Sequence, residues 1–406
     1  MKTLIAFGIL LFIALIGSIK LFNKIKVSSC FAYILYSGTI YVFFGLIVGE
    51  NGFNLISKDI IHQLAPLINF SLGWVGFIFG LQFEIKYLKR IPKNWYLTLP
   101  FTYLTSFFTI VLFSFIIFNY IFDGLVQTIE IALGMSFVLA ILLSESSVSF
   151  ISWSSKFLKK EFLGIRICFF ISAINNLIPI ILTGVIFSLY KYVPASNIIS
   201  LNAPKNILPH FFIQLMIGIL SGFFMFYLVK KITNKLEISA VLFGTIFFIS
   251  GLSLMFHFSP LFVSMLCGVI FSNLTHRHSY FIKILNPTEK PIYIIFLIFL
   301  SLKKAIFNKY IIFIAIFLLL VKFSSKLFTF KSLNKTKLSP FNISPYFSYI
   351  LLPISSIAPA ILLDLLCSYP QHSSSIAQGI FIIALIISEI FSPLGIKLLK
   401  IRSKND

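Results

Sequence analysis

The sequence predicts an all-α polytopic membrane protein with about 13 transmembrane helices. Of its 406 residues, 58% are hydrophobic and only 11% are charged, and the mean hydropathy is +1.00. A soluble domain of this length does not sustain such a composition. The four cysteines stand singly in apolar segments, without the paired spacing of a metal or redox motif, and are expected to be small buried residues.

Apolar segments long enough to cross about 30 Å of hydrocarbon recur along the chain, separated by short polar breaks. We expect thirteen of them, at roughly 4–20, 29–48, 62–83, 97–119, 129–151, 164–190, 209–230, 238–256, 258–273, 290–302, 309–330, 343–367 and 374–397. Residues 1–20 are expected to be the first of these and not a signal peptide, because no small-residue cleavage site follows them.

The basic residues predict the orientation, because cytoplasmic loops carry the excess of Lys and Arg. With the N-terminus outside and the C-terminus cytoplasmic, the inner loops hold 24 Lys and Arg and the outer loops hold seven. The net charge of +21 therefore reflects topology. The basic loops lack the clustering and aromatic interleaving of a nucleic-acid face, so no nucleic acid is expected as a partner.

A few polar residues lie inside the apolar segments, where a charged side chain costs about 2.5–3.5 kcal/mol. Glu145 lies in the stretch 131–151, beside Ser144, Ser146 and Ser147. Asp364 lies in the twelfth segment, and an amide pair, Asn175-Asn176, lies in the sixth. These residues are the first candidates for function.

Two segments also carry an interruption at membrane depth. The fifth contains the Ser-rich run 142–149, and the twelfth contains Pro353 and Pro359, which each remove a helical hydrogen bond. An odd number of crossings separates the two segments, so they run in opposite directions. Two antiparallel discontinuous helices that cross near the midplane are typical of an inverted-repeat transporter. The alternative is that both helices are merely kinked.

Several short motifs, in this order, resemble those of the monovalent cation:proton antiporter superfamily, of which the chain looks like a divergent member. They are Leu46-Ile47-Val48-Gly49, Gly80-Leu81-Gln82-Phe83-Glu84, Ser144-Glu145-Ser146-Ser147, Asn175-Asn176, Phe258-Ser259-Pro260-Leu261 with Gly268, and Ser388-Glu389-Ile390-Phe391-Ser392-Pro393. The resemblance to these sodium/hydrogen exchanger and potassium-efflux type membrane domains runs from about residue 15 to residue 398.

The resemblance implies a single transporter domain over 1–406 that exchanges Na⁺ or K⁺ for protons by alternating access. Its ion-translocating core would be 97–190 and 309–398, and its scaffold and dimerisation helices would be 4–83 and 209–302. A homodimer in a lipid bilayer, the bacterial inner membrane, is implied as well. We expect no cofactor, and no metal beyond the transported ion.

The chain departs from the family at the acidic pair, since Asn176 stands where the family has Asp and cannot titrate. Three interpretations follow. Glu145 has become the exchangeable carboxylate, with Ser146, Ser147, Asn175 and Asn176 as neutral ligands; or Asp364 shares or takes that role; or the fold is kept and exchange is lost, leaving a channel-like, regulatory or degenerate protein.

Lys322 matches the basic residue that the family often has in the eleventh segment. A buried ammonium needs a carboxylate or a wet cavity, and Glu145 and Asp364 are the candidate partners. The alternative is that Lys322 and Lys326 reach the cytoplasmic surface. An enzyme is not expected. Membrane glycosyltransferases and polymer ligases share this hydropathy but need a sizeable outer loop with acids, His or Arg, and the longest outer loop, 191–210, contains no acid.

Overall fold

The computed structural model describes residues 2–18, 30–56, 58–89, 95–121, 129–156, 162–193, 198–201, 204–232, 234–275, 278–335, 345–368 and 372–402. Some basic residues behind the predicted orientation, among them Lys24, Lys26 and Lys93, lie outside these ranges. The predicted orientation therefore stays a prediction.

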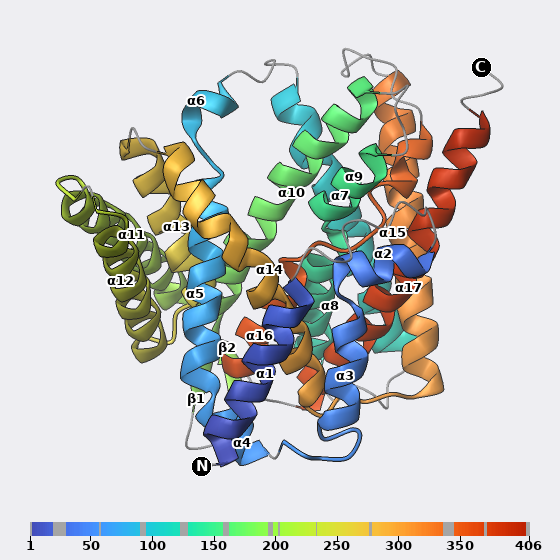
Figure 1. The fold of residues 1–406 in the computed structure, drawn as a ribbon. Coiled ribbons are helices and arrows are strands. Elements are labelled where there is room, and N and C mark those ends of the chain that lie inside the picture. Colours follow the sequence, from blue (N-terminus) through green and yellow to red (C-terminus); the bar gives the residue numbers. More distant parts are fainter. Residues whose placement is uncertain are drawn as a thin grey trace.

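The described chain is almost entirely helical (Figure 1). The α-helices are α1 (Lys2–Ser18), α2 (Cys30–Ser37), α3 (Ile40–Val48), α4 (Lys58–Gln63), α5 (Ala65–Leu81), α6 (Ile85–Leu88), α7 (Trp95–Ile116), α8 (Ile129–Ser144), α9 (Val148–Ser155), α10 (Phe162–Leu189), α11 (Pro204–Val229), α12 (Lys235–Met255), α13 (Pro260–Leu274), α14 (His278–Leu302), α15 (Lys309–Lys335), α16 (Ala358–Ser368) and α17 (His372–Arg402). A π-helical turn η2 (Ile117–Ile121) extends α7, and a 3₁₀ turn η4 (Pro345–Tyr349) precedes α16. The strands β1 (Tyr190–Val193) and β2 (Ile198–Leu201) form a small antiparallel hairpin after α10.

Each of the thirteen predicted segments corresponds to one helix or to a broken pair. Eight helices of the described chain are long and apolar enough to cross a membrane, and α5, α13 and α16 are shorter apolar helices. The fifth segment is α8 with α9, and the twelfth is η4 with α16. The second segment is also divided, because Gly38 takes a positive φ of 87° between α2 and α3, which favours glycine.

The tenth segment is longer than predicted, since α14 begins at His278 and not near residue 290. Pro287, Pro291 and the charged residues Lys283, Glu289 and Lys290 interrupt its apolar pattern. The helix nevertheless continues through both prolines. Hydropathy therefore marked only the C-terminal half of α14.

Glycines allow α5 and α13 to pack closely. A Cβ on Gly76 would collide with the backbone of Leu261, and one on Gly80 with the backbone of Met265 and Gly268. Such contacts between small residues are typical of membrane helices, because they let the backbones approach. Helix α13 also packs against α11 and α12, so these four helices form one side of the molecule.

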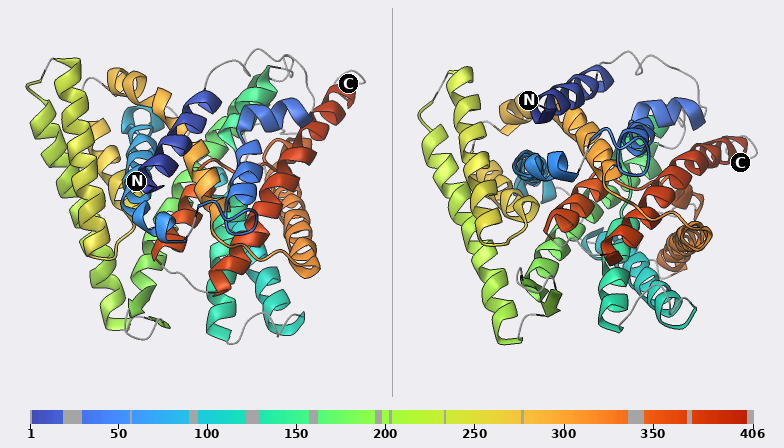
Figure 2. Two further views of the ribbon diagram at one scale, coloured as in Figure 1. Left: turned by 60° about the horizontal axis from the view of Figure 1, so that its bottom comes forward. Right: turned by 90° about the horizontal axis from the view of Figure 1, so that it is seen from below.

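The second side of the molecule is built from α7, α8, α15 and α17, which pack against one another. Figure 1 and both views in Figure 2 show α11 and α12 at one edge and α15 and α17 at the opposite edge. Helices α14 and α16 lie between the two sides, and α16 contacts α8, α13 and α14. The two interrupted segments therefore lie inside the molecule, surrounded by other helices.

Candidate ion site at the crossing of two broken helices

The two interrupted segments meet and hydrogen-bond to each other. The Ser147 N–H donates to the Pro353 carbonyl at 3.0 Å, and the Ser146 hydroxyl donates to the Leu351 carbonyl at 3.0 Å. Ser147 also begins α9, because its side chain accepts a hydrogen bond from the Phe150 N–H at 3.2 Å. Each break thus satisfies backbone groups of the other, which irregular chain at membrane depth requires.

Two more helices complete the crossing. The Ser172 hydroxyl of α10 donates to the Ser146 carbonyl at 2.5 Å. The Lys326 ammonium of α15 donates to the Ser146 hydroxyl and, at 3.2 Å, to the Leu351 carbonyl. The Lys326 ammonium therefore donates a hydrogen bond to one oxygen of each interrupted segment.

Glu145 lies at the centre of this crossing. It is fully buried, and neither carboxylate oxygen makes a hydrogen bond to any residue that the structure describes. The ammonium groups of Lys322 and Lys326 and the hydroxyl of Ser355 are the polar groups that act on this carboxylate. The Glu145 carboxylate therefore lies among two ammonium groups and a hydroxyl, without a hydrogen bond of standard geometry within the described chain.

Lys322 lies on the same face of α15 as Lys326, four residues away. Both side chains are buried, with 0% and 1% of their surface exposed. The interpretation that they reach the cytoplasmic surface is therefore wrong. The Lys322 ammonium makes no hydrogen bond within the described chain and interacts with Glu145 and Lys326 only through space.

The amide pair lies one helical turn beyond Ser172 on α10. Asn175 is fully buried and donates to the Thr102 hydroxyl of α7 at 3.2 Å, and Asn176 is 3% exposed. Residues three and four positions apart share a helix face, so Ser172, Asn175 and Asn176 all belong to the face that approaches the break. The structure thus brings together Glu145, Ser146, Ser147 and Lys322, and it places the amide pair one turn from Ser172, the residue of α10 that bonds to the break.

Asp364 lies elsewhere. It accepts a hydrogen bond of 2.5 Å from the hydroxyl of Ser259, the residue that begins α13, and its second oxygen has no partner in the described chain. It lies about 9 Å along α16 from the break at Ala358. The structure therefore does not bring Asp364 to the crossing.

Two buried charged residues were not predicted from the sequence. Lys326 lies four residues from Lys322 and therefore on the same helix face, a spacing that could have revealed it. Glu389 of α17 is 2% exposed and accepts hydrogen bonds from Ser37, at 2.7 Å, and from Thr39. These hydroxyls lie more than 300 residues away in the sequence, so only the fold could reveal them.

Comparison with solved structures matches the whole chain to one architecture. The sodium/proton antiporter MjNhaP1 from Methanocaldococcus jannaschii, solved at pH 8, is similar with a TM-score of 0.68 at 15% sequence identity, over 98% of this chain and 99% of that chain. The chain has the cation:proton antiporter fold. The crossed discontinuous helices predicted from the sequence are confirmed.

The antiporter fold is recognisable here from structure and not from overall sequence similarity. No family model matches the chain, and no curated protein matches it. Together with its apolar helices, the antiporter fold makes this a multi-pass membrane protein.

Proposed function

We propose that the protein exchanges a monovalent cation, Na⁺ or K⁺, for protons by alternating access, with Glu145 as the exchangeable carboxylate. One observation carries the proposal: a fully buried carboxylate, whose oxygens make no hydrogen bond of standard geometry within the described chain, lies where two broken helices meet. A buried carboxylate is costly unless something neutralises it. A proton and a cation can each do so, and competition for one site couples their movements.

The ligands for a cation would be oxygens of the two breaks. The Ser144 hydroxyl is buried without a hydrogen-bond partner in the described chain, and the hydroxyls of Ser146 and Ser355 lie in the breaks. Hard cations favour such oxygens together with a carboxylate. The carbonyl oxygens of Asn175 and Asn176 would supply neutral ligands from α10.

When neither a proton nor a cation is bound to Glu145, the two lysines supply the positive charge that balances it. The Lys326 ammonium already donates hydrogen bonds to the Ser146 hydroxyl and the Leu351 carbonyl. An arriving cation would displace it from these oxygens. Lys322 has no such ligands and would compensate the carboxylate through space.

A second candidate function is an antiporter fold without exchange. Two ammonium groups face one carboxylate at the crossing, and Asn176 adds no charge. If both lysines stay protonated, the site carries an excess positive charge that repels cations. The same measurement of transport separates the two functions.

The test is cation-dependent proton flux in proteoliposomes, followed with a pH-sensitive dye across pH 6–9. We expect flux from the wild-type protein and none from Glu145→Gln. Glu130→Gln, an exposed acid in the first turn of α8, is the matched control and should retain flux. An absence of flux from correctly folded wild-type protein would establish the second function instead.

Glu145→Gln leaves two buried ammonium groups without a carboxylate, which costs about 3–5 kcal/mol and can impair folding. The double variant Glu145→Gln/Lys322→Met removes one charge of each sign, so the crossing keeps its net formal charge and this cost is reduced. It should fold and still show no flux; flux from this variant would exclude Glu145 as the exchanging group.

We further propose that 97–190 and 309–398 move as the ion-translocating core against 4–83 and 209–302. The protein would work as a homodimer in the bacterial inner membrane, with the N-terminus outside. The family resemblance supports the dimer, and the distribution of Lys and Arg supports the orientation.

A further inference from the structure

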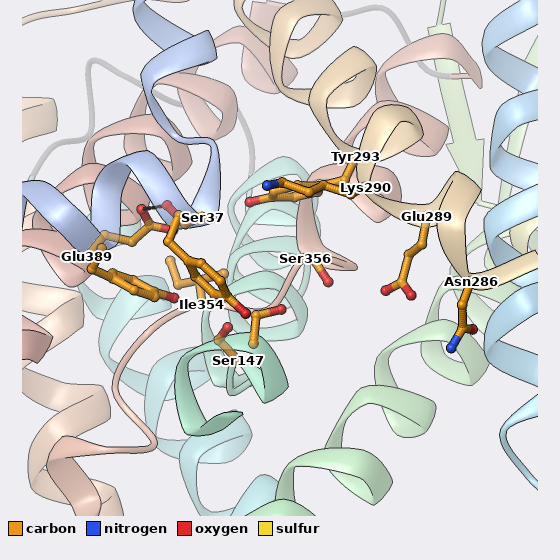
Figure 3. A pocket seen from close by; sticks show the side chains of 12 residues that line it. Ser37, Ser147, Asn286, Glu289, Lys290, Tyr293, Ile354, Ser356 and Glu389 are labelled. Atoms are coloured by element: carbon orange, nitrogen blue, oxygen red, sulfur yellow. Dashed lines mark hydrogen bonds between the residues drawn. The ribbon is translucent and has the colours of Figure 1, made fainter. Parts of the chain in front are cut away.

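A polar cavity of about 240 Å³ lies beside the crossing (Figure 3). Its walls come from α2, α14 and α17 and from both interrupted segments. Ser147 and Ser356 line it, one from each break, and the Ser147 N–H is the group that bonds to Pro353 at the crossing. The cavity therefore reaches the candidate ion site from outside it.

Glu389 forms the buried end of this cavity. One of its oxygens accepts hydrogen bonds from Ser37, at 2.7 Å, and from Thr39. The hydroxyl-bearing rings of Tyr33 and Tyr293 also line the cavity. A carboxylate surrounded by hydroxyl groups is a suitable environment for a hard monovalent cation, which prefers oxygen ligands.

Glu289 lies on the opposite side, on α14, and is half-buried (Figure 3). Its neighbour Lys290 also lines the cavity, with its ammonium 6.0 Å from the centre of the Tyr36 ring. Lys156 contacts the same ring at 5.4 Å without lining the cavity. Among the described residues, the lining therefore carries two carboxylates and one ammonium, a net formal charge of −1.

Glu389 and Glu289 are separate from the crossing. Glu389 bonds to the hydroxyls of Ser37 and Thr39, outside the two interrupted segments, and Glu289 lies on α14. The cavity is also larger than a bare alkali ion requires, since one water molecule takes about 30 Å³ of liquid. It therefore has room for an ion that keeps part of its hydration shell.

We propose that this cavity is a second cation site, in which Glu389 and Glu289 bind a partly hydrated Na⁺ or K⁺ outside the crossing. The idea that this ion is the transported one rests on the proposed function. The binding of an ion in the cavity does not depend on that function. The single negative charge of the lining matches a monovalent cation. The hydroxyls of Ser147 and Ser356 then lie between the bound ion and the crossing.

Equilibrium binding of radiolabelled sodium, and of rubidium in place of potassium, to the purified full-length protein in detergent tests the site. We expect Glu389→Gln to weaken binding about tenfold, since the nearest charge is lost. Glu289→Gln, at the half-exposed side, should weaken it less. Gln keeps an oxygen that accepts from Ser37 and Thr39, so the fold around position 389 is preserved.

The double variant Glu145→Gln/Lys322→Met separates this site from the proposed exchange. Binding that survives in this variant and is lost on adding Glu389→Gln supports the cavity site, even if the wild-type protein shows no proton flux. Glu130→Gln is again the matched control. Unchanged binding in both Glu389→Gln and Glu289→Gln would overturn the proposal. Cation-induced protection against thermal unfolding, lost in the same variants, is the second readout.

Discussion

At the scale of single residues, the crossing contains two lysines with different surroundings. Lys326 holds the Ser146 hydroxyl and the Leu351 carbonyl, whereas the Lys322 ammonium has no hydrogen bond within the described chain. A buried charge with partners stabilises the contact that it makes, while one without partners carries an uncompensated desolvation cost. The two lysines should therefore respond differently to the same substitution.

We expect Lys326→Met to lower stability by about 1–3 kcal/mol, because a bond from each break is lost. Lys322→Met should leave stability unchanged or raise it, because Met has a similar volume and no charge to desolvate. Thermal unfolding of the two variants in the same detergent measures the difference. Equal destabilisation would contradict the contacts assigned to Lys326.

Glu145 could be predicted from sequence because a single acid in an apolar run is conspicuous by composition alone. Neither the role of Lys326 nor that of Glu389 could be predicted in this way. Both depend on oxygen partners from distant segments, and those partners become neighbours only when the helices pack. The same limit applies to Asp364, whose partner Ser259 comes from α13.

At the scale of helices, the α5–α13 contact depends on the absence of side chains. Gly76 and Gly80 of α5 lie directly against the backbone of α13, where a Cβ has no room. In contrast, Gly244 of α12 has open space at the position of a Cβ. These two environments predict opposite effects for the same kind of substitution.

Gly80→Val should separate α5 from α13 and lower the thermal stability of the protein by about 1–3 kcal/mol, the usual cost of overpacking. Gly244→Ala should be neutral or stabilising by up to about 1 kcal/mol, because Ala is the better helix former. Thermal unfolding and the yield of monodisperse protein on gel filtration compare them. Tolerance of Val at position 80 would contradict the close approach.

The helix pattern itself was largely predictable, because membrane helices must be long and apolar. The break in the fifth segment was signalled by its serines, and that in the twelfth by Pro353 and Pro359. Prolines were misleading in α14, where Pro287 and Pro291 interrupt the apolar pattern without ending the helix. Neighbouring helices α3, α5 and α16 pack on α14 and support it there.

At the scale of the whole molecule, the orientation in the membrane follows from charge. Lys231, after α11, and Lys304, after α14, are exposed in the structure. The positive-inside rule places Lys231 in the cytoplasm and Lys304 outside. Three helices, α12, α13 and α14, separate the two positions. An odd number of crossings puts them on opposite sides of the membrane, so they test both the orientation and the helix count.

In a variant without the four native cysteines, Lys304→Cys should react with an impermeant maleimide in intact cells. Lys231→Cys should react only after the membrane is opened. The reverse result would invert the orientation. Labelling of both positions from the same side would contradict the number of crossings between α11 and α14.

The Lys326 ammonium, which bonds to both interrupted segments, would affect how ion binding at the crossing depends on ion concentration. Lys326 is a cation that is covalently attached to the protein and cannot diffuse away from the oxygens of Ser146 and Leu351. A soluble ion that binds those oxygens must displace this attached ammonium, so the affinity of the crossing for Na⁺ or K⁺ would be lower than the same oxygens would give without the lysine.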